Sequence, residues 1–338
     1  MPTAPRPSRP IPSNRLIAAA IASLIISVGT AHAADDVAAQ VAAVERGLRP
    51  PVSFEGDVPW TLADRMRHYG VPGLTISVVH DGKVAWTRVY GLADREAGLP
   101  MTERTLLLAG SVSKPVAAYG ALRMVQAGDL GLNQPVNARL TSWQIPANDL
   151  TDKVPVTLAH LLSHTGGLTV HGFAGYTAGT PVPDTVAVLN GTPPANSAPV
   201  RVDLLPGSKM RYSGGGYTVA QLLMGDVAKQ SFPALMQDRV LGPLGMIDSN
   251  FSNPLPAAQL PRAAAGILPD GSELSGKRNN YPEMAAAGLW TTSQDLARFL
   301  IEVQQALQGQ SPRLSQALAQ DMLTPRLGSG YGLGLAVP

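Results

Sequence analysis

The sequence predicts an α+β protein, in which strands near both ends of the chain form one sheet and the middle is a mostly helical insertion. The strand pattern and a tight-turn signal come before residue 90, and another strand pattern covers residues 330–337. Between them, residues 128–290 mix short helical patterns with loops rich in Pro and Gly. We therefore assign residues 34–127 and 291–338 to the sheet region and residues 128–290 to the helical and loop region.

The first 33 residues have the pattern of an export signal. Arg6, Arg9 and Arg15 give a positive start, residues 16–28 are an apolar run, and Ala31-His32-Ala33 has the small-x-small form of a cleavage site. The run is short for the ~20 apolar residues that a membrane span needs. We expect cleavage near Ala33, a periplasmic or secreted protein, and no stable membrane anchor.

The charge and the cysteine count exclude several classes of function. The whole chain has a net charge of +2, and residues 1–33 contain three arginines and no acidic residue, so their removal leaves −1. No basic patch remains that would indicate nucleic-acid binding. The absence of cysteine excludes disulfides, thiol catalysis and Cys-bound zinc. No cofactor is expected.

The amino-terminal elements begin with two helices and a hairpin. Helical patterns cover residues 37–48 and 61–69, and Gly70 ends the second. Residues 74–79 are rich in β-branched side chains, Asp81-Gly82 is a two-residue turn signal, and residues 84–89 run back.

The later elements include a helix over residues 115–126. Pro115 is tolerated only in the first helical turn, so the helix must begin just before it, and Ser111 lies at or beside its N-terminus. A short helix is expected over residues 157–163, stopped by Gly166-Gly167. Thr292 with Asp295 predicts a capping box before a helix that reaches residue 307. Residues 330–337 are predicted to form the last strand.

Ser111-Val112-Ser113-Lys114 is the only Ser-x-x-Lys sequence in the chain. Residues three apart at a helix start share a face, so the Lys114 amine can reach the Ser111 hydroxyl. The helix terminus adds backbone N–H groups and a partial positive charge, which favour an alkoxide or an oxyanion. This pattern indicates a nucleophilic serine. The alternative is a Ser cap followed by a solvated lysine.

Tyr212 lies in the second candidate motif, residues 211–217, where it precedes Ser213 and three glycines. A tyrosine acts as a base only if its pKa falls from ~10 toward neutrality, and a nearby ammonium lowers it. Lys114 is the group expected to supply that charge. The glycines allow close approach of a substrate or another strand. The alternative is a buried tyrosine beside a glycine-rich turn.

Two rival sites are set aside. No Gly-x-Ser-x-Gly occurs, which argues against the nucleophile of an α/β-hydrolase. His160, His164 and His171 are spaced somewhat like the ligands of a zinc protease, but Leu161 stands where the catalytic Glu is needed and the last His is one residue out of step. No metal site is expected, and we expect His160 and His164 to be structural and to close a helix end.

The order of these motifs resembles the serine β-lactamase-like family, especially class C β-lactamases and the related esterases and D-aminopeptidases. The similarity covers the chain from about Trp60 to its end. It is carried by Val71-Pro72-Gly73, Ser111 to Lys114, Leu161 to Leu168, Tyr212-Ser213-Gly214, and Gly288 to Thr292 with Asp295-Leu296.

The resemblance implies an antiparallel sheet flanked by helices plus a helical region, with the active site in the cleft between them. It implies that Ser111 is acylated, that Lys114 keeps the proton network charged, and that Tyr212 accepts the serine proton and passes it to the leaving group. Ser213 and Gly214 would contact the substrate, a small-molecule ester, β-lactam or D-amino-acid amide.

Two departures from the family pattern affect these expectations. Gly214 stands where the family usually has Asn, which favours ester substrates. The family's third motif, a Lys or His with Gly two residues later on a C-terminal strand, has no match there, and His164-Thr165-Gly166 lies on a helix end instead. The resemblance then implies an incomplete sheet. It leaves open a catalytically impaired or noncatalytic penicillin-binding-like protein, a transpeptidase-like enzyme, and the oligomeric state.

Overall fold

A computed structural model describes residues 1, 36–49 and 52–337. Its backbone contacts divide the chain into two compact units, Met1–Val71 and Pro72–Pro338. The export signal predicted over residues 1–33 lies outside the described residues, apart from Met1. Of the helices in the described part, none has the length and apolar character to cross a membrane. The division into sheet and helical regions stays a prediction.

The first unit contains the two helices that the sequence predicts. Residues 36–46 are helical, and α2 spans Leu62–His68. Thr61 caps α2, because its hydroxyl accepts a hydrogen bond from the Asp64 N–H at 3.1 Å. Both predicted helices are confirmed, with ends that differ by one or two residues.

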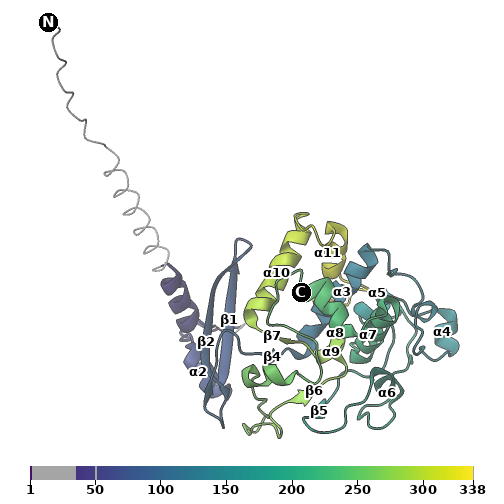
Figure 1. Cartoon of the computed structure of the whole chain (residues 1–338), viewed down its shortest axis with the longest axis horizontal. Coiled ribbons are helices and arrows are strands. Elements are labelled where there is room, and N and C mark those ends of the chain that lie inside the picture. Colours follow the sequence, from purple (N-terminus) through teal and green to yellow (C-terminus); the bar gives the residue numbers. More distant parts are fainter. Residues whose placement is uncertain (2–35, 50–51, 338) are drawn as a thin grey trace. The chain divides into compact units, whose positions relative to one another are not determined.

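The second unit starts with the predicted hairpin. Strands β1 (Gly73–His80) and β2 (Lys83–Asp94) pair antiparallel, and β3 (Leu99–Pro100) pairs with the end of β2. Asp81 and Gly82 make the turn with φ of 49° and 68°, the left-handed region that Gly and Asp tolerate. Helix α10 (Ser293–Leu307) packs against β1 and β2, as Figure 1 shows. The antiparallel sheet flanked by a helix is confirmed.

Two very short sheets join segments that are distant in the sequence. Strand β4 (Leu107–Leu108) pairs with β7 (Trp290–Thr291), and β5 (Tyr176–Thr177) pairs with β6 (Asn279–Asn280). Just after β4, the Ala109 N–H donates to the Leu289 carbonyl at 2.8 Å. The β4–β7 pair therefore brings the chain just before residue 290 next to the Ser-x-x-Lys motif.

The remaining elements are helices and helical turns, and most of them surround one large apolar core to which α3 contributes residues 116–119, 121, 122 and 124. On α3, Tyr119 is fully buried and donates to the Glu302 carboxylate of α10 at 2.8 Å. The elements are η1 (Gly110–Val112), α3 (Ser113–Gln126), η2 (Val136–Ala138), α4 (Asp149–Lys153), α5 (Leu158–Leu162), α6 (Thr185–Asn190), α7 (Gly214–Ala228), α8 (Phe232–Met236), η3 (Gln237–Leu241), η4 (Ala257–Arg262), α9 (Met284–Ala287) and α11 (Gln316–Leu323). Helices α3, α5 and α10 confirm the three helical predictions of this unit.

The strand predicted over residues 330–337 is wrong. Tyr331 and Ala336 form a single antiparallel bridge, and the residues between them turn back on themselves. Gly330 and Gly334 have φ of 68° and 97°, which a strand does not contain. The alternation of apolar residues with glycine therefore reflects a tight turn.

The capping box at the start of α10 is half formed. The Thr292 hydroxyl accepts from the Asp295 N–H at 3.1 Å, as predicted. The Asp295 carboxylate accepts instead from the Asp248 N–H and the Ser249 hydroxyl, at 3.0 and 2.8 Å. This buried carboxylate therefore ties α10 to the segment around residue 248.

Candidate active site

Ser111 and Lys114 meet at the junction of η1 and α3. Pro115 is the third residue of α3, where its missing N–H costs nothing, and η1 runs directly into the helix. Ser111 is exposed and Lys114 is only 4% exposed. The Lys114 amine donates to the Ser111 Oγ at 3.0 Å and to the Ala286 carbonyl of α9 at 2.8 Å. A solvent-facing hydroxyl thus lies against a buried amine.

Burial controls the charge of this amine. Removal from water penalises the ammonium form, which lowers the pKa of Lys114 from 10.5 to about 8. Besides the hydroxyl and the carbonyl, its Nζ lies 4.9 Å from the ring centroid of Tyr212 and 5.7 Å from that of Tyr217. Burial alone lowers the pKa, so a neutral amine is present in appreciable amount near pH 8.

Tyr212 is brought to the same hydroxyl, but its pKa shifts in the direction opposite to the prediction. Burial raises the pKa of the phenol, and a hydrogen bond with Ser111 lowers it by less. The expected lowering fails because burial disfavours the phenolate more than the hydrogen bond with Ser111 favours it. The structure therefore unites all three predicted side chains, with the tyrosine as a phenol.

The segment from residue 164 to residue 171 holds the Tyr212 motif in place. The Ser213 hydroxyl caps α7 by accepting from the Gly216 N–H at 2.9 Å, and it donates to the Thr169 carbonyl at 2.7 Å. The Gly214 N–H donates to the His171 carbonyl at 3.0 Å. These contacts fix the backbone on the carboxyl side of Tyr212.

The two residues predicted to contact substrate are engaged inside the protein. Ser213 is 3% exposed and both roles of its hydroxyl are filled by the backbone contacts above. A Cβ at Gly214 would lie 3.1 Å from both the His171 carbonyl oxygen and the Phe173 ring, which explains why an Asn does not fit there without a shift. Substrate contact by these two residues stays a prediction.

The histidines set aside in the sequence have different positions. The His160 Nδ1 accepts from the Thr157 N–H at 3.3 Å, so this residue caps the start of α5 and not its end. His164 follows the end of α5 and stacks on Tyr212 with ring centroids 4.2 Å apart. Sequence reasoning missed this contact, although His164 lies inside the Leu161 to Leu168 stretch that carried the family resemblance.

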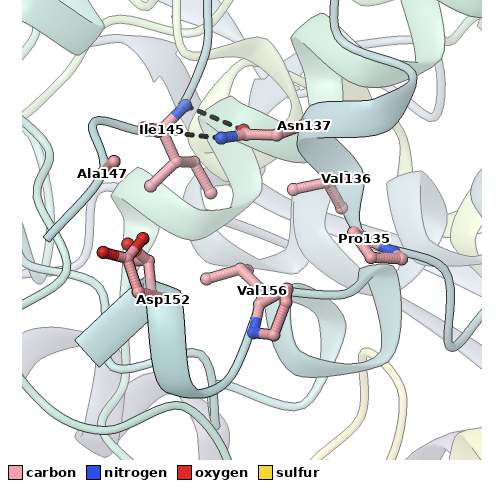
Figure 2. Close-up of a pocket in the computed structure, with 9 residues that line it drawn as sticks. Pro135, Val136, Asn137, Ile145, Ala147, Asp152 and Val156 are labelled. Atoms are coloured by element: carbon pink, nitrogen blue, oxygen red, sulfur yellow. Dashed lines mark hydrogen bonds between the residues drawn. The ribbon is translucent and has the colours of Figure 1, made fainter. Parts of the chain in front are cut away.

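A small pocket elsewhere in the second unit has no comparable chemistry. It has a volume of about 110 Å³ and is lined by residues between 135 and 156. Figure 2 shows the Asn137 amide hydrogen-bonded to the Ile145 backbone, at 2.8 and 2.9 Å. None of Ser111, Lys114 and Tyr212 lines this pocket.

Comparison with known proteins shows the family of the chain. The beta-lactamase family model matches residues 61–337. The chain is 34% identical over 194 residues to esterase EstB from Burkholderia gladioli, covering 55% of this chain and 48% of that protein. It is 28% identical to a beta-lactamase from Yersinia enterocolitica, covering 71% of this chain and 57% of that protein. The chain thus spans about half the length of these relatives.

Solved structures share the fold. A D-alanine carboxypeptidase AmpC from Burkholderia cenocepacia superimposes with a TM-score of 0.59 at 26% identity, covering 77% of this chain and 66% of that one. EstCE1, described as a hydrolase with promiscuous acyltransferase activity, gives a TM-score of 0.63 at 23% identity, covering 80% and 79%. The second likeness concerns the fold alone.

Proposed function

The chain belongs to the beta-lactamase family, and on this basis we propose that it is a serine hydrolase that transfers acyl groups through a covalent intermediate on Ser111. The observation that carries the proposal is the 3.0 Å contact between the Lys114 amine and the Ser111 hydroxyl, at a position open to solvent. The nucleophile and its base are already within hydrogen-bonding distance.

The directions of the two pKa shifts suggest how the proton moves. As the Ser111 Oγ attacks the acyl carbonyl, its proton passes to the neutral Lys114 amine. The protonated Tyr212 phenol then donates to the departing oxygen and recovers its proton from the lysine. Water cleaves the acyl-enzyme by the reverse proton path. The base is therefore the lysine, whereas the family resemblance implies the tyrosine.

Esters are the substrate class we propose. Gly214 replaces the amide side chain that the family resemblance leads one to expect, and the backbone there leaves no room for it without a shift. The support from relatives is the 34% identity to esterase EstB. Short p-nitrophenyl esters are expected to turn over faster than the β-lactam nitrocefin.

Labelling with a fluorophosphonate tests the proposal. The wild-type chain should gain one adduct by intact mass and should hydrolyse p-nitrophenyl butyrate, and Ser111→Ala should abolish the adduct and lower hydrolysis by about 10³-fold or more. Ser231→Ala is the matched control, because Ser231 is exposed and makes no side-chain capping bond. An adduct of equal yield in Ser111→Ala would refute the proposal.

The second candidate is a penicillin-binding-like protein without turnover. The observation that favours it is that the two residues after Tyr212 offer no free polar side chain to a substrate, since the Ser213 hydroxyl is engaged by backbone groups and Gly214 has no side chain. This candidate predicts a stable Ser111 adduct with labelled penicillin and no Ser111-dependent hydrolysis of ester or nitrocefin. Sustained ester turnover by this chain would exclude it.

A further inference from the structure

His164 contacts the chain on both sides of Tyr212. Its carbonyl accepts from the Arg211 N–H at 2.8 Å, and its Nδ1 accepts from the Ser213 N–H at 3.1 Å. Its ring stacks on the phenol ring of Tyr212, with centroids 4.2 Å apart and planes at 28°. One residue therefore holds the backbone before and after Tyr212 and also its ring.

The backbone of His164 is itself fixed. The residue is 2% exposed and has a φ of 60°, a conformation that few residues other than Gly, Asn and Asp adopt readily. Its ring also meets those of Tyr217 and Tyr331 at centroid distances of 5.2 Å each. The imidazole is thus enclosed by aromatic side chains and has one fixed orientation.

The protonation state of the imidazole follows from its contacts. Because Nδ1 accepts a hydrogen bond, the single proton of the neutral ring lies on Nε2. Burial, with smaller contributions from Lys114 and His171, lowers the pKa of His164 to about 3. The ring therefore stays neutral at the pH where Lys114 titrates and remains an acceptor for the Ser213 N–H.

We propose that His164 is a positioning residue that keeps the Tyr212 hydroxyl at Ser111, acting through the Ser213 hydrogen bond and the stacked ring. The proposal rests on the proposed function. The simpler alternative is that the imidazole only fills space in the core. If the imidazole only fills space, any side chain of similar volume can replace it. If it positions Tyr212, the replacement must keep an acceptor atom for the Ser213 N–H.

The test compares side chains that keep or lose this acceptor. Asn presents an oxygen near the position of Nδ1 and tolerates the positive φ, whereas Gln moves its oxygen one bond further away and Phe has no acceptor. We expect His164→Phe and His164→Gln to lower the fluorophosphonate labelling rate ~10- to 100-fold, the effect of a small displacement of a reacting group. His164→Asn should be labelled at least ~10-fold faster than His164→Gln.

A double-mutant cycle with Tyr212→Phe separates positioning from loss of fold. If His164 acts through the tyrosine hydroxyl, His164→Gln should lower the rate only when that hydroxyl is present. His160→Gln is the control, since His160 accepts a similar backbone hydrogen bond, from Thr157, and the ring contacts of Tyr212 in the described part of the chain are with other residues. Circular dichroism checks folding, and if the Phe variant does not fold, the Asn and Gln pair carries the test.

The outcomes distinguish this inference from the proposed function. Equal labelling of Ser111→Ala and wild type would overturn the proposed function. An inert Ser111→Ala together with wild-type rates in His164→Gln would overturn the positioning role alone. The positioning role would also be overturned if His164→Gln lowered the labelling rate as much in the Tyr212→Phe background as in the wild type. Equal labelling rates for His164→Asn and His164→Gln would overturn it too.

Discussion

At the scale of single residues, burial shifts two neighbouring groups in ways that suit acyl transfer. It lowers the pKa of the Lys114 ammonium to about 8 and raises the pKa of the Tyr212 phenol. Both shifts have the same cause, because a site with little water disfavours the charged form of each group. The lysine becomes a base and the tyrosine stays an acid, which is the division of roles that a proton relay needs.

The first prediction concerns the pH dependence of acylation. The neutral amine is the base, so the labelling rate of Ser111 should rise as the pH increases through about 8 and should level off above it. Measuring fluorophosphonate labelling between about pH 6 and pH 11 gives the profile. A rate that keeps rising through pH 10 would assign the base to Tyr212 instead. Lys114→Arg should be slow at every pH, because the guanidinium keeps its proton.

Glu283 is a further buried ionisable residue, three positions before Ala286. It is fully buried, and neither carboxylate oxygen has a hydrogen-bond partner in the described part of the chain. Burial raises the pKa of this carboxyl from 4.5 to about 7. Glu283 also precedes α9, the helix whose Ala286 carbonyl accepts from Lys114. The ionisation of Glu283 is therefore expected to affect the stability of α9, the helix that contacts the Lys114 amine.

The second prediction is that Glu283→Gln changes how stability depends on pH. A carboxyl with a raised folded-state pKa stabilises the fold fully below pH 4.5, and this contribution is lost as the pH rises through about 7. The wild type should lose about 2–3 kcal/mol relative to Glu283→Gln between pH 5 and pH 8. Urea unfolding of both proteins at these two pH values measures the difference. Parallel pH dependences would contradict the burial of a titrating carboxyl.

At the scale of elements, the sequence predicts best what is determined locally. The hairpin follows from Asp81-Gly82 between two β-branched runs, and the start of α10 follows from the capping threonine Thr292. Ser111 and Lys114 meet because they lie one helical turn apart. In each case the interacting groups are within a few residues of one another, so spacing alone is sufficient.

What the sequence missed at the site depends on contacts between distant segments. The pKa of Tyr212 is set by burial, and the link from His164 to Ser213 crosses 49 residues of sequence. Neither spacing nor composition encodes such packing. The signal that could have indicated His164 is its place between Ser163 and two glycines, in a stretch that the family resemblance already singled out.

The third prediction concerns the carboxyl-terminal turn, whose glycines pack against other elements. Gly334 has a φ of +97°, and a Cβ there would lie 2.4 Å from the Ala118 Cβ on α3, whereas Gly328 has a φ of +63° and open space around it. The positive φ destabilises both Ala variants, but only Gly334→Ala adds a steric clash with α3, the helix that contains Lys114. We expect Gly334→Ala to be about 1–3 kcal/mol less stable than Gly328→Ala.

Thermal unfolding and Ser111 labelling of the two glycine variants measure this effect. Gly334→Ala should also be labelled more slowly, because α3 has to shift to accommodate the new methyl group. Equal stability and equal labelling of the two variants would show that the turn does not constrain α3.

At the scale of the whole molecule, one compact unit contains every residue of the candidate site. Ser111, Lys114, Tyr212, His164 and Ala286 all lie in Pro72–Pro338. They lie in η1, α3 and α9, just before α7 and just after α5, so five parts of one unit determine the geometry. The chemistry proposed here therefore depends on the packing of this unit.

The last prediction concerns where the chain functions. We propose that residues 1–33 direct export and are removed, because a positive start, an apolar run and a small-x-small site follow one another there. Expression of the full chain in a Gram-negative host should give a periplasmic product that begins at Ala34. Its net charge should be −1 where the full chain has +2, so the product should focus at a lower pH than the precursor.

A charge placed in the apolar run provides the control for export. Leu24→Arg should block translocation and leave the unprocessed chain in the cytoplasm, because the run no longer offers an uninterrupted apolar segment to the export machinery. Intact-mass measurement of both cell fractions distinguishes the two forms. Full-length wild-type protein in the cytoplasm, with none processed, would contradict the export signal. Because the site residues all follow residue 71, Ser111 labelling should be the same in the processed and unprocessed forms.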